Sequence, residues 1–449
     1  MTQCTTDGAS FASLGRRRID ADFRGGQLVS DSGVLLLREV DRQIGLSEGI
    51  AACLPDPRQP AKIRHDQQTM IGQRLMALAC GYEDLNDHDQ LRHDAVMQIA
   101  AEQTPGEDAT LASPSTLCRL ENRVERKALV QINAVFVERF LASRQQAPAQ
   151  IILDFDATDD RLHGQQEGRF FHGYYDHYCY LPLYVFCGHD LLCAYLRPSN
   201  IDPAKHSRAI LKLLVQRIGQ DWPDTRIIVR GDSGFCRWRL MRWCDRHHVG
   251  YILGLARNPV LERLSADFAQ AAEAAYRQTG QKQRHFHVIE YGAKKWDRLR
   301  SVVVKAEHLS EGRNLRFVVT NLIPEVVADP QELYDRMYCQ RGEMENRIKE
   351  QQLMLFADRT SCHRLLSNQF RLLLSSAAYV LLQTLRRTAL AGTTLAQAQV
   401  ETIRLKLIKI AARVQVSVRR VLVSLASDHP SRALFAQVAA RLSGPAAPS

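Results

Sequence analysis

The chain has 449 residues, of which 45% are hydrophobic and 24% are charged, and its formal net charge at pH 7 is +10. This length and composition exclude a low-complexity chain and predict roughly two to four structural units with a real apolar core. A basic balance suits a polyanionic partner. Many basic proteins bind nothing acidic, however, so the charge only supports evidence from elsewhere in the chain.

The cysteines and the hydropathy of the chain indicate in which cellular compartment the protein is expected. The eleven cysteines include no C-x-x-C pair, and we expect free thiols in a reducing cytoplasm rather than a zinc site. The N-terminal residues lack the apolar core of a signal peptide. The most apolar stretch, residues 370–385, is too short for a membrane span and is predicted to be a buried helix. We therefore expect a cytoplasmic protein with no membrane partner.

The first part of the chain is predicted to be mainly helical. Residues 1–30 are polar and expected to be extended. Apolar positions recur at helical spacing in 33–46 and 66–82, and a long helix is predicted over 116–141. A helical region that opens a basic protein can bind DNA, mediate assembly or act as a plain scaffold, and the sequence leaves these alternatives open.

Residues 150–255 change to short apolar runs. Strands are predicted at 150–157, 179–187, 190–197, 225–231 and 250–255, with helices at 204–219 and 236–247. This order fits an α/β layer architecture with a mixed sheet. Three further strands within 285–322 are predicted to form an antiparallel insertion. Residues 330–390 are predicted to be helical, and residues 400–425 alternate basic and apolar side chains.

Three acidic residues lie in distinctive settings. Asp156 ends the run IILDFD and Asp232 ends IIVRGD, whereas Glu345 lies in the predicted helix YCQRGEMENRIKE. Carboxylates brought together repel one another, and a divalent cation removes that conflict. Two metal ions about 3.5–4 Å apart form a clamp for in-line displacement at phosphorus, for which nucleic acid is the natural substrate of a basic chain. Taken alone, each aspartate also fits a capping role at a strand end.

Other side chains share faces with these acids. Strand alternation places Asp154 and Asp156 on one side, so one is a candidate metal ligand and the other its support. One helix face carries Tyr338, Arg341, Glu345 and Lys349. A carboxylate beside cations and a phenol suits a metal ligand next to a phosphate, with Arg341 forking onto phosphate oxygens. The alternative for this stripe is a surface ladder of salt bridges.

These motifs carry a resemblance to a known family. LDFDATDD-x-x-HG-x-Q-E, then RGDSGF, then Y-x2-RG-x2-EN-x-IKE resembles the catalytic signature of DDE transposases of bacterial insertion sequences. The chain resembles most the branch with a β-strand insertion between the second and third acids, specifically insertion-sequence family 1380. DFRGGQLVSDSGVLLLREVD and LASPSTLCRLEN also look like that family, so the resemblance covers nearly the whole chain.

The resemblance implies an α/β fold: a ribonuclease-H-like catalytic core with an antiparallel β insertion, flanked by helical N- and C-terminal regions. The implied divisions are a mostly helical DNA-binding or assembly region (1–145), the first part of the core (146–258), the β-rich insertion (259–328), core helices carrying the third acid (329–391) and a basic C-terminal region (392–449).

The resemblance also implies a metal site. Asp156 corresponds to the first acid, because the family's motif is D-x-T and Thr158 follows it. Asp232 and Glu345 correspond to the second and third acids. Together they are implied to be catalytic and to bind two Mg²⁺ ions, with Mn²⁺ as a substitute. Asp154 and Thr158 are candidate supporting residues.

The third motif implies contacts with DNA. Tyr338 and Arg341 match its tyrosine and arginine. A related, broader signature has a lysine seven residues after the glutamate, where this chain has Gln352. Lys349, on the same helix face as the glutamate, is the candidate substitute. In the basic C-terminal region we also expect phosphate contacts from Arg419 and Arg420.

The leading interpretation is a DNA transposase that cleaves the ends of an insertion sequence and joins them to target DNA. Its partner would be double-stranded DNA, bound by a homodimer associated with the bacterial nucleoid. A metal-dependent nuclease of the same fold without strand transfer is the first alternative, because it needs the same metal clamp. A domesticated DNA-binding protein without catalysis is the second, although such a role would leave the three acids free to drift.

Overall fold

The structure, a computed structural model, describes residues 8–23, 26, 28–106 and 110–444. They form two compact units. The terminal unit contains the described residues of Met1–Ser47, Pro57–Cys118 and Thr384–Pro445, and the central unit contains Glu48–Asp56 and Arg119–Gln383. Segments from both ends of the sequence therefore belong to one unit, and most of the residues between them form the central unit.

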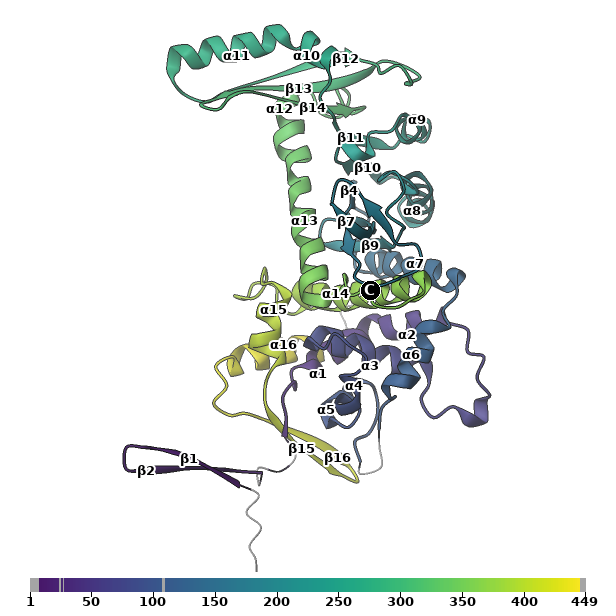
Figure 1. Ribbon diagram of the computed structural model, residues 1–449, viewed down its shortest axis with the longest axis vertical. Coiled ribbons are helices and arrows are strands. Elements are labelled where there is room, and N and C mark those ends of the chain that lie inside the picture. Colours follow the sequence, from purple (N-terminus) through teal and green to yellow (C-terminus); the bar gives the residue numbers. More distant parts are fainter. Residues whose placement is uncertain (1–7, 24–25, 27, 107–109, 445–449) are drawn as a thin grey trace, which may run out of the picture. The chain divides into compact units, whose positions relative to one another are not determined.

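The central unit is built on an eight-stranded mixed sheet in the order β12-β13-β14-β11-β10-β4-β8-β9 (Figure 1). Its strands are β4 (Gln150–Ala157), β8 (Leu183–Cys187), β9 (Asp190–Tyr195), β10 (Arg226–Gly231), β11 (Gly250–Leu255), β12 (Gln283–Tyr291), β13 (Arg300–Leu309) and β14 (Gly312–Thr320). β10 runs parallel to β4 and β11, and the other neighbours pair antiparallel. The five strands β9-β8-β4-β10-β11, with helices after β9 and β10, form the ribonuclease-H-like core, so the predicted fold class is confirmed.

Both faces of this sheet are covered. One face packs against α7 (Arg126–Ala142), α8 (Ser207–Asp221) and α9 (Trp238–Arg246) through a continuous apolar core. On the other face, Ile228 and Ile252 share an apolar cluster with Leu333 of a long helical run. Strands buried on both faces are near-continuous apolar runs. For that reason the sequence located β4 and β11 to the residue.

The long helical run, residues 330–354, is not a regular α-helix. It consists of α12 (Pro330–Glu332), a π-helical turn (Leu333–Tyr338), a 3₁₀ turn (Cys339–Arg341), α13 (Gly342–Lys349) and a second π-helical turn (Glu350–Met354). Figure 1 shows it as one rod that crosses the sheet. π-Helical turns inside helices are frequent at functional sites, and here they flank the third predicted motif.

The predicted β insertion also contains helices. α10 (Pro259–Leu264) and α11 (Ala266–Thr279) precede β12 and were not expected from the sequence. The small side chains of Ala269 and Ala272 belong to the same apolar core as the sheet, which lets α11 lie close to the strands. Because β14 pairs with β11, the three insertion strands extend the core sheet and do not form a sheet of their own.

One predicted helix is wrong as a single element. The segment expected to be helical over 116–141 forms α6 (Pro114–Asn122) and α7, separated by residues 123–125. Val124 is buried at this break, and Arg123 pairs with Asp56 at 3.5 Å. No proline or glycine marks the break, so the helical periodicity alone runs across it.

The terminal unit combines N-terminal helices with C-terminal elements. Its elements include β1 (Gly8–Leu14), β2 (Arg17–Asp22), β3 (Leu28–Val29), α1 (Val34–Ile44), α3 (Gln67–Cys80), α4 (His88–Leu91), α5 (Ala95–Ala100), α15 (Val400–Ile403), a π-helical turn (Arg404–Ile408), β15 (Ala412–Ser417), β16 (Arg420–Leu425) and α16 (Arg432–Ser443). β1 and β2 form a hairpin, and β15 pairs with both β16 and β3. The extended expectation for residues 1–30 is met by these strands where they are described, while residues 1–7, 24–25 and 27 lie outside the described part.

N- and C-terminal segments interlock in the terminal unit. The amides of Ser32 and Gly33 donate hydrogen bonds to the carbonyls of Ile410 and Ile408 at 3.1 and 3.0 Å. A Cβ at Gly33 would lie 1.7 Å from the carbonyl oxygen of Leu407, so only glycine allows this approach. The two segments therefore form one packed body.

The most apolar stretch is a core helix. It lies in α14 (Leu365–Thr388), which by length and composition alone is apolar enough to cross a membrane. In the structure 83% of its most apolar window is buried inside the protein, as the prediction of a buried helix requires. The ten cysteines within the described residues are free.

Candidate active site

β4 delivers two carboxylates to one face of the sheet. Asp154 and Asp156 alternate with Leu153 and Phe155, which belong to the apolar core on the opposite face. Both carboxylates are buried, and Oδ1 of Asp156 accepts the amide of Ala157 at 2.9 Å. The face that they share is the one covered by the long helical run.

Asp154 is held in an ion pair. Its partner is Arg230, the residue opposite it in register on β10. Nη2 of Arg230 donates to Oδ2 of Asp154 at 2.7 Å, and Nε donates to Oδ1. The same guanidinium donates through Nη1 to the carbonyl oxygen of Met337, in the first π-helical turn. This buried pair therefore anchors the helical run onto β4 and β10.

Asp232 follows β10 at the turn into a short 3₁₀ helix (Ser233–Phe235). Its Oδ1 accepts the amide of Gly234 at 2.8 Å, which is the N-cap that the sequence offered as an alternative role. The side chain stays partly exposed. Capping and a role in the site are therefore compatible.

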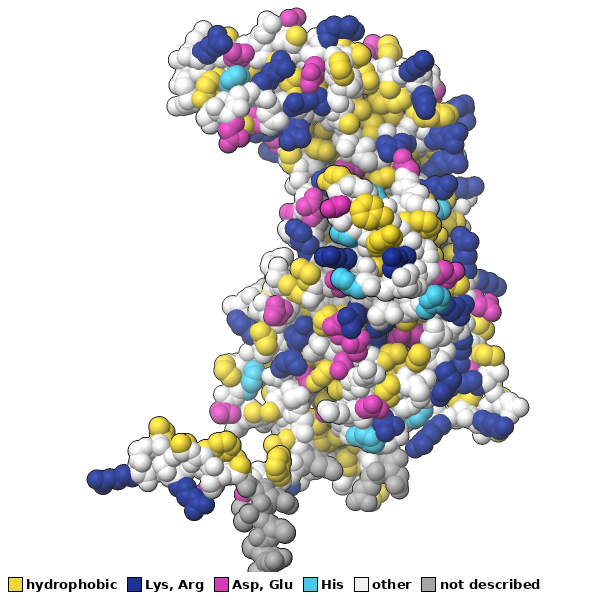
Figure 2. All heavy atoms as spheres, in the orientation of Figure 1, with side chains coloured by type: hydrophobic (Ala, Val, Ile, Leu, Met, Phe, Trp, Pro, Cys, Tyr) yellow, Lys and Arg dark blue, Asp and Glu magenta, His cyan; other side chains and the backbone are white. Residues whose placement is uncertain are grey.

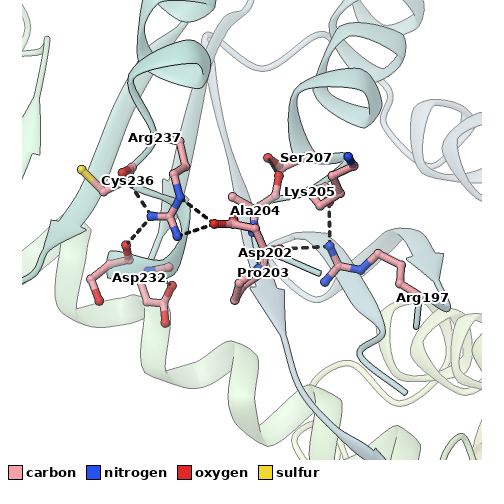
Figure 3. Close-up of polar contacts among 11 residues, drawn as sticks. Arg197, Asp202, Pro203, Ala204, Lys205, Ser207, Asp232, Cys236 and Arg237 are labelled. Carbon is pink, nitrogen blue, oxygen red and sulfur yellow. Dashed lines mark hydrogen bonds and ion pairs between the residues drawn. The ribbon is translucent and has the colours of Figure 1, made fainter. Parts of the chain in front are cut away.

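A neighbouring loop, residues 198–206, is held against this turn (Figure 3). Arg237 donates to Asp202 from Nε and Nη2 at 3.1 and 2.9 Å. Arg197 donates from Nη1 to the carbonyls of Pro203 and Lys205 at 2.9 and 2.6 Å. Arg197 is buried without a carboxylate partner among these acceptors, and burial lowers its pKa to about 10. Two guanidiniums thus fix the loop beside the second acid.

Arg341 links the first and third acids. Its Nη1 lies 3.5 Å from Oδ2 of Asp156, and its Nη2 lies 3.4 Å from Oε1 of Glu345. Glu345 is half exposed, whereas Arg341 is mostly covered. The helix stripe predicted from the sequence therefore faces β4 at this point.

Gly254 on β11 lets the helical run approach the second acid. A Cβ here would lie 2.5 Å from Oη of Tyr338 and 2.9 Å from the amide nitrogen of Ser233. Real Cβ atoms essentially never come so close to backbone. The absence of a side chain at Gly254 therefore allows Tyr338 to pack beside the turn that carries Asp232.

The three acids act on one another electrostatically. Burial raises the pKa of Asp156 to about 7. The charge of Arg341 opposes this rise, and those of Asp232 and Glu345 add to it. For Arg341, burial lowers the pKa, but the charge of Asp156 and those of its other neighbours outweigh burial and leave the pKa raised. Burial also raises the pKa of Tyr338.

The donor set suits a hard divalent cation. Carboxylate oxygens are the ligands that Mg²⁺ and Mn²⁺ prefer. The pKa of Asp156 is raised chiefly by burial and further by the charges of Asp232 and Glu345, and a bound cation would favour its charged form. Among the described residues, no three His, Cys, Asp or Glu side chains are gathered closely enough to hold an ion as they stand. Arg341 lies between two of the three acids. Convergence of all three on one metal position stays a prediction.

The other predicted residues have different surroundings. Lys349 is exposed one turn beyond Glu345, and the amide of Thr158 donates to the carbonyl of Pro182 at 3.3 Å. Arg419 and Arg420 are exposed at the turn between β15 and β16, in the terminal unit.

Gln352 has a structural partner. Its Nε2 donates to Oδ1 of Asp160 at 2.8 Å and to the carbonyl of Asp159 at 3.0 Å. Burial raises the pKa of Asp160 well above its ordinary value, which favours the protonated acid. A neutral amide suits this neutral partner, which is a physical reason for glutamine where the broader signature has lysine.

Two residues of this site were missed from the sequence. Arg230 could have been noticed, because a single charge inside the apolar run IIVRGD needs a buried partner. Gly254 gave no local signal, since its importance depends on a helix that lies far along the chain.

Comparisons with known proteins add three findings. A family model described as "Transposase DDE domain group 1" matches residues 11–446. No curated protein shows a significant match. Among solved structures, a cryo-EM structure of the piggyBac transposase synaptic complex with hairpin DNA is similar, with a TM-score of 0.38 and 9% identity, covering 86% of this chain and 82% of that one.

Proposed function

Because the chain belongs to the transposase DDE domain group 1 family, we propose that it is a DNA transposase that cleaves the ends of an insertion sequence and joins them to target DNA. The observation that carries this proposal is the contact of Arg341 with both Asp156 and Glu345, beside the turn of Asp232. The charges of Asp232 and Glu345, from two other segments, both act on the carboxylate of Asp156. We further propose that the chain belongs to the branch of insertion-sequence family 1380, on the motifs quoted above.

Each group has a proposed role in phosphoryl transfer. Asp156, Asp232 and Glu345 would hold divalent cations, Mg²⁺ in the first place, which supply Lewis acidity at phosphorus when bound. Arg341 stabilises the acids before substrate arrives and has a fork geometry that suits phosphate oxygens. Tyr338 lines the site beside the second acid. Arg230 and Asp154 fix the helical run so that these side chains keep their positions.

The decisive experiment separates cleavage from DNA binding. Asp156→Asn, Asp232→Asn and Glu345→Gln should each lower Mg²⁺-dependent cleavage of labelled element ends by at least about a hundredfold, because the cation loses a ligand. DNA affinity should stay close to normal, since it comes from Lys and Arg. Glu343→Gln, an exposed carboxylate on the same helix, is the matched control. Undiminished cleavage in all three variants would remove these acids from the site.

The products distinguish the two alternatives. A transposase gives joined molecules in which element ends are linked to target DNA, whereas a nuclease of the same fold gives only cleaved fragments. A domesticated binding protein gives neither, although it retains affinity for the ends. We propose that the DNA-bound form is a homodimer in the bacterial cytoplasm, which the mass of the complex on two element ends would test.

A further inference from the structure

A small three-stranded sheet that carries several aromatic side chains follows the first acid in the sequence. It consists of β5 (Asp160–Arg161), β6 (Phe170–His172) and β7 (His177–Tyr180). Among the described residues, six Phe, Tyr or Trp side chains are highly exposed, and four of them lie here: Phe170 (41%), Phe171 (53%), Tyr174 (85%) and Tyr178 (43%). Figure 2 shows hydrophobic and histidine side chains at the surface over β7. We call residues 169–178 the aromatic hairpin.

The rings of the aromatic hairpin are ordered against one another. Phe171 and Tyr178 are opposite each other in register, with ring centroids 5.7 Å apart. The guanidinium of Arg169 lies 4.1 Å from the centroid of the Tyr178 ring. Tyr174, at the tip, contacts Tyr175 with centroids 5.0 Å apart. The hairpin thus presents preformed ring faces beside a cation.

The aromatic hairpin is tied to the candidate active site at its base. His177 contacts Asp159 at 2.7 Å, and the carbonyl of Asp159 accepts from Gln352, two helical turns beyond Glu345. Burial raises the pKa of Tyr175 to about 12, and the charges of Asp159 and Asp156 add to the rise. Tyr175, which contacts Tyr174 at the tip, therefore lies within electrostatic range of the first acid.

We propose that the aromatic hairpin binds unpaired nucleobases of the DNA strand next to the scissile phosphate, by stacking them on Tyr174, Phe171 and Tyr178. Every nucleobase has a flat π-face, and stacking on aromatic side chains tolerates any sequence. Those faces are covered inside a duplex, so the hairpin selects a strand end or an opened site. Arg169, whose guanidinium lies over the Tyr178 ring, adds a cation next to these faces that would attract the phosphate of a stacked nucleotide.

Continuity with the acids favours this occupant over a protein partner. The inference rests on the proposed function, because the hairpin is linked through Asp159 and Gln352 to the segments that carry the first and third acids. Apolar patches exposed in this way mark binding sites when they are contiguous. A second copy of the chain covering the same rings is the competing outcome, which the experiment detects.

The test uses the full chain without divalent cation, so that cleavage does not interfere. Two probes are compared: a 40-base-pair duplex with fully paired ends, and the same duplex with four unpaired nucleotides at one end that include 2-aminopurine. Tyr174→Leu should weaken binding of the unpaired probe about tenfold and abolish the fluorescence change of 2-aminopurine. Binding of the paired duplex should not change. Tyr174→Trp, which restores a π-face, should rescue both readouts.

Phe23→Leu is the matched control, because it removes an exposed ring outside the aromatic hairpin. Equal effects of Tyr174→Leu on both probes, an equal effect of Phe23→Leu, or a change only in the oligomeric state would each overturn the inference. A wild-type protein that binds neither probe would instead overturn the proposed function. Thermal unfolding of each variant confirms that these exposed positions leave the fold intact.

Discussion

Asp154 and Asp156 lie two residues apart on one strand face, yet the chain uses them differently. Asp154 is neutralised by Arg230 and closed off from solvent, so it holds the site together. The ion-pair contact of Asp156 with Arg341 is longer, at 3.5 Å. Burial raises the pKa of Asp156, and a bound cation would offset that cost to its charged form. The sequence predicted their shared face from strand alternation but left open which aspartate served which role. That choice depends on Arg230, which the register of β10 brings opposite Asp154.

Replacing Arg230 should show whether its role in anchoring the helical run is distinct from its contribution to the stability of the fold. Arg230→Met leaves Asp154 as a buried unpaired charge and should lower the free energy of unfolding by about 3–5 kcal/mol. Adding Asp154→Leu removes that charge and should recover most of the stability. Cleavage should stay low in both variants, because the Met337 carbonyl has lost its donor. Denaturant unfolding and cleavage rates provide the two readouts. A double variant that regains full cleavage would show that Arg230 does not position the helix.

The pKa of Asp156 predicts how stability depends on pH in the absence of metal. The pKa of Asp156 is near 7 in the folded protein, compared with its ordinary value of 3.8 in the unfolded chain. At a pH between these two values, the folded state therefore holds a proton that the unfolded state has released. The free energy of unfolding should therefore fall as pH rises from about 4 to about 7, by up to about 4 kcal/mol from this group. Asp156→Asn should remove this part of the slope in urea titrations. An identical slope in wild type and variant would contradict the assignment.

At the scale of elements, secondary structure was predicted most accurately for segments that are buried along their whole length. β4 and β11 match their predicted limits because strands buried on both faces are continuous apolar runs. The break between α6 and α7, where Val124 is buried, was missed because no proline or glycine marks it. In residues 400–425 the basic pattern did not separate buried from exposed cations: Arg404 is buried and donates to the carbonyl of Ala79 at the end of α3. Periodicity cannot distinguish such a cation from one that faces DNA.

The turn of the β15–β16 hairpin offers a test of phosphate contact. Arg419 and Arg420 are exposed there, unlike Arg404. On duplex DNA, log affinity falls by about 0.9 per neutralised phosphate for each log unit of salt. Arg419→Gln combined with Arg420→Gln should reduce that slope by up to about 1.8 and weaken all sequences alike. The pair Lys294→Gln and Lys295→Gln, also adjacent and exposed, changes the net charge equally and should leave the slope unchanged. Equal effects of both pairs would indicate net charge instead of contact.

At the scale of the whole molecule, the sequence predicted the order of the motifs but not which distant segments pack into the same unit. The three acids and the insertion between the second and third follow from the resemblance and from strand and helix patterns. That residues 28–47 and 400–425 pack together depends on glycine at position 33 and on main-chain hydrogen bonds. Contacts of this kind leave no periodic trace in the sequence. The boundaries implied by the resemblance stay predictions.

The interlocked terminal unit has a consequence for synthesis on the ribosome. A nascent chain can complete the central unit once Gln383 has emerged, but the partners of Ser32 and Gly33 lie at Ile408 and Ile410. Chains grow at about 5–20 residues per second, so the hydrogen bonds of Ser32 and Gly33 form only after residues 408–410 have been made. A message cut short after the central unit would encode all three acids without a finished terminal unit. Translation past Ile410 is therefore a condition for closing the terminal unit.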